Sequence, residues 1–224
     1  MTTGLQAVAR TRIKVCGLAR SEDVRAVVEA GADAAGFVMV PGSPRYVSPD
    51  DVALLAGRLP PFVTPVAVVD LTDPLDTGRA EALRQVVASG IRCIQFHGFE
   101  APYDIQRWKL TLSIQVIKTI HLHTRADIAA LATFEAHVDA FLLAEKDEQG
   151  RSENWELAAE AVLACSKPVI LAGGLTPANV ARALSQVRPF GVEVSSAVES
   201  ASGLKDLGKL STFVRAVQPV APTL

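Results

Sequence analysis

Short runs of apolar residues recur along the whole chain, each bounded by glycine, proline or polar residues. Several are apolar at nearly every position, which is typical of strands that are buried on both faces of a parallel sheet. We predict eight strands, at residues 12–16, 33–39, 65–70, 92–96, 114–120, 139–143, 168–172 and 191–195.

Amphipathic stretches fill the segments between these strands, and some carry the signals of helix ends. In SEDVRAVVEAG we expect Ser21 to be the N-cap and Gly31 to end the helix. Ser48 with Pro49, and Thr176 with Pro177, predict two further helix starts, because proline suits the first helical position. The segments DPLDTGRAEALRQVVASG and WELAAEAVLAC also have helical patterns.

Strands that alternate with helices indicate a parallel sheet. Eight such units in 224 residues favour a single closed (β/α)8 (TIM) barrel. An open doubly wound sheet is the alternative, but no G-x-G-x-x-G motif follows the first strand. We find no low-complexity linker, so we assign residues 1–11 to an N-terminal extension and residues 12–224 to one barrel domain.

Composition and charge restrict the partners. The formal net charge is -2 and no Lys/Arg run occurs, which gives no electrostatic reason to expect nucleic acid or an anionic membrane as a partner. The sequence shows neither a signal peptide nor an apolar run long enough to span a membrane, so we expect a cytoplasmic protein. Cys16, Cys93 and Cys165 are widely spaced, which argues against a disulfide scaffold and against a zinc site.

In such barrels the carboxyl ends of the strands carry the active site, so residues there are the candidates. Cys16 closes the first strand and could be a base or nucleophile, although a free cysteine is often only a small buried hydrophobe. Arg45, in the loop after the second strand, could bind a carboxylate or phosphate, or simply be solvated. Gln95 and His97 share one face at the end of the fourth strand and could both reach the barrel mouth.

Two loops predict a phosphate site. Gly173 and Gly174 follow the seventh strand, and Ser195 and Ser196 follow the eighth. Loops at these positions commonly hold phosphate in (β/α)8 barrels, through backbone N–H groups that point at the anion. The sequence therefore predicts a phosphorylated small-molecule ligand.

These motifs, in this order, resemble those of the phosphoribosylanthranilate isomerase family of tryptophan biosynthesis. The resemblance runs from about residue 12 to the end, through IKVCGLARSEDV, AGADAAGFVMVPGSPRYVSP, LPPFVTPVAVV, CIQFHGFE, VIKTI, ILAGGLTPANVARAL and GVEVSSAVESASGLKD. It implies an aldose–ketose isomerase that converts N-(5-phosphoribosyl)anthranilate into 1-(2-carboxyphenylamino)-1-deoxyribulose 5-phosphate by an Amadori rearrangement. No metal or cofactor is required by the family, and we expect a monomer or a homodimer.

The resemblance also implies roles for individual residues. The reaction needs an acid for the ring oxygen and a base for the proton on C2′. The base maps onto Cys16, and the group that meets the anthranilate carboxylate maps onto Arg45. The phosphate-binding residues map onto Gly173, Gly174, Ser195 and Ser196. From their place at the strand tip, rather than from the resemblance, we expect Gln95 and His97 to be substrate-binding residues.

The chain departs from the family at the end of the sixth strand. The family has LLD there, and its aspartate is the general acid, whereas this sequence has LLA and places Ala144 at that position. We expect Ala144 to point into the barrel mouth and the carboxylates at 145–148 not to reach the ring oxygen. Asp70 and Glu193, which lie at the ends of other strands, are the rival catalytic acids.

Three functions therefore stay open. The first is this isomerase with a weakened or relocated acid. The second is a divergent paralogue that acts on another phosphorylated sugar adduct, and the third is a non-catalytic barrel that binds a phosphorylated ligand. Cys16 favours the two enzymes, because a binding protein needs no base, whereas the alanine at position 144 favours the third.

Overall fold

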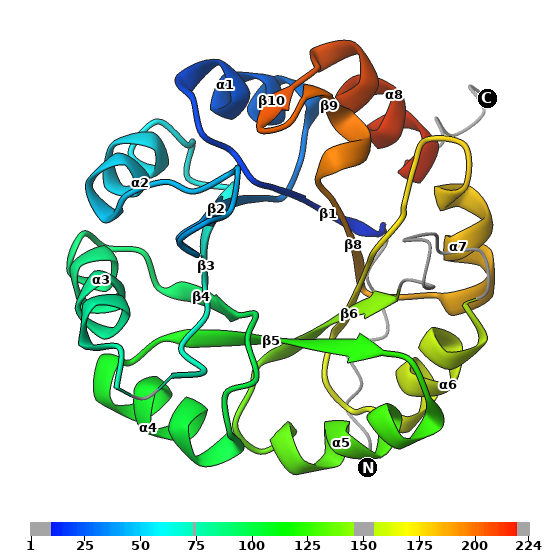
Figure 1. Cartoon of the computed structure of the whole chain (residues 1–224). Helices are drawn as coiled ribbons and strands as arrows, with labels where there is room; N and C mark the ends of the chain where they lie inside the picture. The colour runs from blue at the N-terminus through cyan, green and yellow to red at the C-terminus, as the bar shows by residue number, and fades with distance from the viewer. Residues whose placement is uncertain (1–9, 74, 146–154, 219–224) are drawn as a thin grey trace.

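A computed structural model describes residues 10–73, 75–145 and 155–218. Strands β1 to β8 are parallel and close into a barrel in chain order, with β8 paired to β1 (Figure 1). They are β1 (Arg12–Cys16), β2 (Ala34–Val38), β3 (Thr64–Val69), β4 (Cys93–Phe96), β5 (Gln115–Leu122), β6 (Ala140–Glu145), β7 (Val169–Ala172) and β8 (Gly191–Val194). The predicted (β/α)8 barrel is thus confirmed, and the predicted strands differ from these only at their ends.

Helices form a ring outside the strands (Figure 1). They are α1 (Ser21–Ala30), α2 (Pro49–Ala56), α3 (Thr77–Ala88), α4 (Pro102–Leu112), α5 (Arg125–Phe134), α6 (Glu156–Ala164), α7 (Val180–Val187) and α8 (Leu207–Val217). Within the described ranges, none of these helices has the length and apolar character needed to cross a membrane. The predicted extension lies mostly outside the described residues, although Arg10 forms an ion pair with Asp33 at 2.6 Å.

One predicted helix start is confirmed and two are wrong. Ser48 caps α2 by accepting a hydrogen bond from the Asp51 N–H. Ser21 already lies within α1, whose N-cap is Arg20. Helix α7 begins three residues beyond Pro177, because Asn179 closes a turn: its side chain accepts from the Thr176 N–H and donates to the Gly174 carbonyl.

Two apolar layers hold the barrel together. The outward faces of the strands pack against the helices, with Phe37, Phe96 and Phe141 fully buried. A smaller cluster fills the inside of the barrel and consists of Val66, Ile117, Leu142, Ile170 and Ala172. Because side chains alternate along a strand, the inward positions of β5 after Ile117 are Thr119 and His121. The interior therefore becomes polar toward the carboxyl ends of the strands.

A short hairpin after β8 was not predicted. The 3-10 helix η1 (Ser196–Val198) leads into β9 (Glu199–Ala201), which pairs antiparallel with β10 (Leu204–Lys205). The hairpin lies beside α1 and α8 (Figure 1). It brings Glu199 and Lys205 to the carboxyl end of the barrel.

Candidate active site

A pocket of about 800 Å³ opens at the carboxyl ends of the strands. On one side it is lined by the loops that follow β7 and β8, and on the other by histidines at or just beyond the ends of β4 and β5. Of the predicted site residues, the pocket wall brings together His97, Gly173, Gly174, Glu193, Ser195 and Ser196. A second cavity of about 310 Å³ lies at the opposite end of the barrel and includes none of the predicted site residues.

The two phosphate-loop candidates face the same pocket. Gly173 and Gly174 have φ values of 91° and 61°, a left-handed conformation that side chains disfavour, so glycine is required there. Ser195 stands directly before η1, and its hydroxyl donates to the Cys16 carbonyl at 3.1 Å. This contact fixes the loop after β8 against the end of β1.

Cys16 is buried at the end of β1, on the inward face that it shares with Lys14. A Cβ atom at Gly36 would come within 2.9 Å of its sulfur, so the neighbouring glycine makes room for the thiol. Burial raises the pKa of Cys16, as does the Glu193 carboxylate, while Lys14 and Lys205 act in the opposite direction. The two lysines would stabilise a thiolate if one formed.

Lys14 and Glu193 form an ion pair inside the barrel. Only 3% of the Lys14 side chain and 13% of the Glu193 side chain are exposed. Burial acts to lower the pKa of Lys14, but Cys16 and Glu193 outweigh it and raise the pKa overall. Lys14 thus links the Glu193 carboxylate to the Cys16 thiol.

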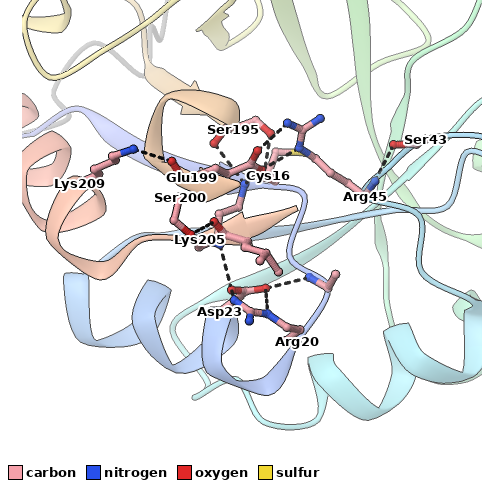
Figure 2. Close-up of polar contacts among 12 residues, drawn as sticks. Cys16, Arg20, Asp23, Ser43, Arg45, Ser195, Glu199, Ser200, Lys205 and Lys209 are labelled. Carbon is pink, nitrogen blue, oxygen red and sulfur yellow. Dashed lines mark hydrogen bonds and ion pairs between the residues drawn. The ribbon is translucent and has the colours of Figure 1, made fainter. Parts of the chain in front are cut away.

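Arg45 is held by a network that the sequence did not predict. Its Nε and Nη2 atoms donate to the two oxygens of Glu199 at 2.8 and 2.6 Å, and Lys205 donates to the same carboxylate at 2.7 Å (Figure 2). The Arg45 side chain crosses directly over Gly17, where an added Cβ would lie 2.4 Å from its Cδ. No local pattern marks Glu199 and Lys205, because the hairpin that carries them is specified by its packing.

Gln95 and His97 occupy different environments. Gln95 is buried inside the barrel and donates to Thr119 at 3.0 Å. His97 lines the pocket, and its ring meets the ring of His121 edge-on with centroids 5.4 Å apart. Burial lowers the pKa of His97, and nearby lysines add to this against the opposing effect of Glu193.

His121 and His123 also line the pocket, and the sequence reasoning missed both. Strand β5 runs two residues beyond its predicted end, which carries His121 to the pocket as the next inward position after Thr119. The alternation within VIKTIHL was the signal that could have found it.

Asp70 lies close enough to His97 for the charge of the imidazole to act on it, but its carboxylate is held by other partners. Its carboxylate accepts from the Thr72 N–H at 3.0 Å, lies 3.6 Å from Arg79 and rests against Gly98. Burial would raise the pKa of Asp70, but the bonds from Thr72 and the charge of Arg79 outweigh it and lower the pKa. Asp70 is not part of the pocket wall.

Ala144 lines the pocket, as expected, between Ala172 of β7 and His121 of β5. The expectation about the carboxylates at 145–148 falls outside the described side chains. Among the side chains that the structure describes, no three His, Cys, Asp or Glu residues are grouped so that they could hold a metal ion.

A closed (β/α)8 barrel with glycine and serine loops after β7 and β8 defines a class of barrels whose mouth is suited to phosphorylated ligands. The family model described as N-(5'phosphoribosyl)anthranilate (PRA) isomerase matches residues 13–216. The chain therefore belongs to the N-(5′-phosphoribosyl)anthranilate isomerase family.

Individual relatives agree. The N-(5′-phosphoribosyl)anthranilate isomerase of Chromohalobacter salexigens is 40% identical over 223 residues, which are 97% of each chain. The crystal structure of phosphoribosyl anthranilate isomerase from Thermotoga maritima has a TM-score of 0.80 and 34% identity, covering 92% of this chain and 98% of that one. A phosphoribosyl anthranilate isomerase in complex with reduced 1-(o-carboxyphenylamino)-1-deoxyribulose 5-phosphate has a TM-score of 0.78 and 33% identity, with the same coverage.

Proposed function

We propose that this protein catalyses the Amadori rearrangement of N-(5′-phosphoribosyl)anthranilate in tryptophan biosynthesis. The observation that carries the proposal is the match to the isomerase family over residues 13–216, which include every strand from β2 to β8 and nearly all of β1. The pocket at the carboxyl ends of these strands supports it, because its wall combines phosphate-loop geometry with titratable side chains.

Substrate binding would use the two ends of the site. The loops at Gly173–Gly174 and Ser195–Ser196 would take the phosphate through backbone N–H groups. Arg45 would take the anthranilate carboxylate. Its Nε and Nη2 atoms are engaged by Glu199, so the orientation of the guanidinium is fixed while Nη1 stays available among the described contacts. A substrate held at both ends would have its ribose between them.

Cys16 is the proposed general base for the C2′ proton. A thiol must lose its proton before it can accept another, and burial makes this harder in the unliganded protein. The positive charges of Lys14 and Lys205 act against burial and lower the pKa of Cys16. We therefore expect the thiolate to be formed with their help once the substrate has displaced water from the pocket.

The test is a direct assay. Purified protein should convert N-(5′-phosphoribosyl)anthranilate to the ribulose product, followed by the change in anthranilate fluorescence, and should restore growth to a tryptophan auxotroph that lacks this isomerase. Tight binding of the reduced product analogue without turnover would support the non-catalytic alternative. Turnover restricted to other phosphorylated sugar adducts would support the paralogue.

The expected setting is the cytoplasm, with the protein a monomer or a homodimer. Cell fractionation and sedimentation equilibrium measure these two properties separately from activity.

A further inference from the structure

The β5–β6 pairing places an imidazole beside the smallest side chain of the pocket wall. His121 and Ala144 are direct partners in the register of the two strands, and both point into the barrel. Neighbouring strands lie about 4.8 Å apart. Because the alanine side chain is a single methyl group, the space in front of it lies within reach of the longer side chain on β5.

The other acids described at this end of the barrel are poorly suited to give a proton. Of the described residues that line the pocket, the titratable ones are Glu193, His97, His121 and His123. Glu193 is already engaged by the ammonium of Lys14 inside the barrel. Asp70 is held by Thr72 and Arg79 outside the pocket wall.

The position of His121 distinguishes it from the other two histidines. His97 belongs to the loop after β4, one strand farther from Ala144. His123 follows the last residue of β5, beyond the paired part of the strand. His121 alone of the three is both inside the barrel sheet and in register with Ala144.

Its surroundings orient the ring and set its charge. The rings of His97 and Phe99 lie 5.4 and 6.4 Å from it, centroid to centroid. Burial lowers the pKa of His121, and the charged forms of His97, His123 and Lys118 lower it further, against a hydrogen bond to the backbone of His97. A bound substrate brings a phosphate and a carboxylate into the same pocket, and their negative charge favours the imidazolium.

We infer that His121 is the general acid of the reaction, acting from β5 in the space that Ala144 leaves open on β6. The inference rests on the proposed function. The imidazolium N–H gives its proton to the ribose ring oxygen as the bond from C1′ to that oxygen breaks. The nitrogen lone pair of the anthranilate forms the C1′=N bond, and Cys16 then removes the C2′ proton. The enol amine that results becomes the ketone when its 2′ hydroxyl loses a proton and C1′ gains one. Solvent returns a proton to the imidazole and takes one from the thiol, so the isomerisation balances.

The test compares His121→Ala with wild type on N-(5′-phosphoribosyl)anthranilate. General acid catalysis contributes about 10²–10⁴-fold, so kcat should fall by that factor while KM stays within about threefold. Added imidazole should restore part of the rate in proportion to its concentration. Placing a carboxylate on the neighbouring strand, in His121→Ala/Ala144→Asp, should restore it as well. His123→Ala is the control, because it removes a neighbouring imidazole from the same pocket. It should lower kcat by less than about tenfold.

The outcomes separate this inference from the proposed function. A wild-type protein with no turnover contradicts the proposed function itself. An active wild type together with a His121→Ala variant within threefold of it refutes the role of His121. If turnover is lost but neither imidazole nor Ala144→Asp restores it, His121 is only structural, and the inference is again refuted. Should His121→Ala fail to fold, His121→Gln keeps the size and polarity and carries the same expectation.

Discussion

The ion-pair network beneath Arg45 allows a quantitative prediction for Glu199→Gln. Glu199 and Lys205 are almost completely buried, with 4% and 0% of their side chains exposed, and Arg45 is 21% exposed. Burial alone would raise the pKa of Glu199, but Arg45 and Lys205 lower it from 4.5 to about 2. Glutamine removes the charge and leaves the buried ammonium of Lys205 without a counter-ion.

The magnitude follows from the pKa and from measured ion pairs. The interval from 4.5 to about 2 corresponds to roughly 3 kcal/mol at about 1.36 kcal/mol per pH unit. Breaking a buried pair by removing one partner typically costs about 3–5 kcal/mol. We therefore expect Glu199→Gln to lower the free energy of unfolding at pH 7 by about 3 kcal/mol.

The sign of the pH dependence is fixed by the lowered pKa. The carboxylate contributes its stabilisation fully above about pH 4.5 and loses it as the pH falls toward about 2, so this part of the pH dependence should be missing from the variant. Urea unfolding followed by circular dichroism, repeated between pH 7 and pH 2.5, measures both effects.

A double variant provides the control. Glu199→Gln/Lys205→Met removes both charges from the buried pair, so it should recover at least about 1 kcal/mol relative to Glu199→Gln. The reasoning would be refuted if the free energy of unfolding of Glu199→Gln at pH 7 lay within about 0.5 kcal/mol of wild type and fell with pH below about 4.5 as it does in wild type.

Three further variants test the site. Cys16→Ala should abolish turnover while the dissociation constant of the reduced product analogue stays within about threefold, because the phosphate and carboxylate contacts remain; equal turnover would leave Cys16 a packing residue. Cys93→Ala should leave turnover unchanged, since burial raises the pKa of this thiol to about 11 and Cys93 lines the cavity at the opposite end of the barrel from the pocket. Gly17→Ala should raise KM about tenfold, because the new Cβ would strike Arg45 and Gly17 has a φ of +81°; an unchanged KM would show that Arg45 does not bind the substrate.

The barrel itself was readable from the sequence. Strands buried on both faces must be apolar at nearly every position, so each of the eight strands was visible locally. The same holds for Ser48, whose cap depends on a hydrogen bond to a residue three positions away. Motifs at strand ends, such as Cys16 and the loops after β7 and β8, could be assigned to one face because parallel strands end on the same side of a barrel.

Tertiary structure decided which of those residues meet. Asp70 and Glu193 lie at comparable positions at strand ends and could not be told apart from the sequence. In the structure, Asp70 pairs with Arg79 and is not part of the pocket wall, whereas Glu193 pairs with Lys14 inside the barrel and lines the pocket. Glu199 reaches Arg45 across 154 positions of sequence, through a hairpin whose short strands give no pattern of their own. The pairing of His121 with Ala144 depends on the register between β5 and β6. Alternation along one strand fixes only which face a side chain takes, and the relative shift of two strands is set by the closure of the whole barrel.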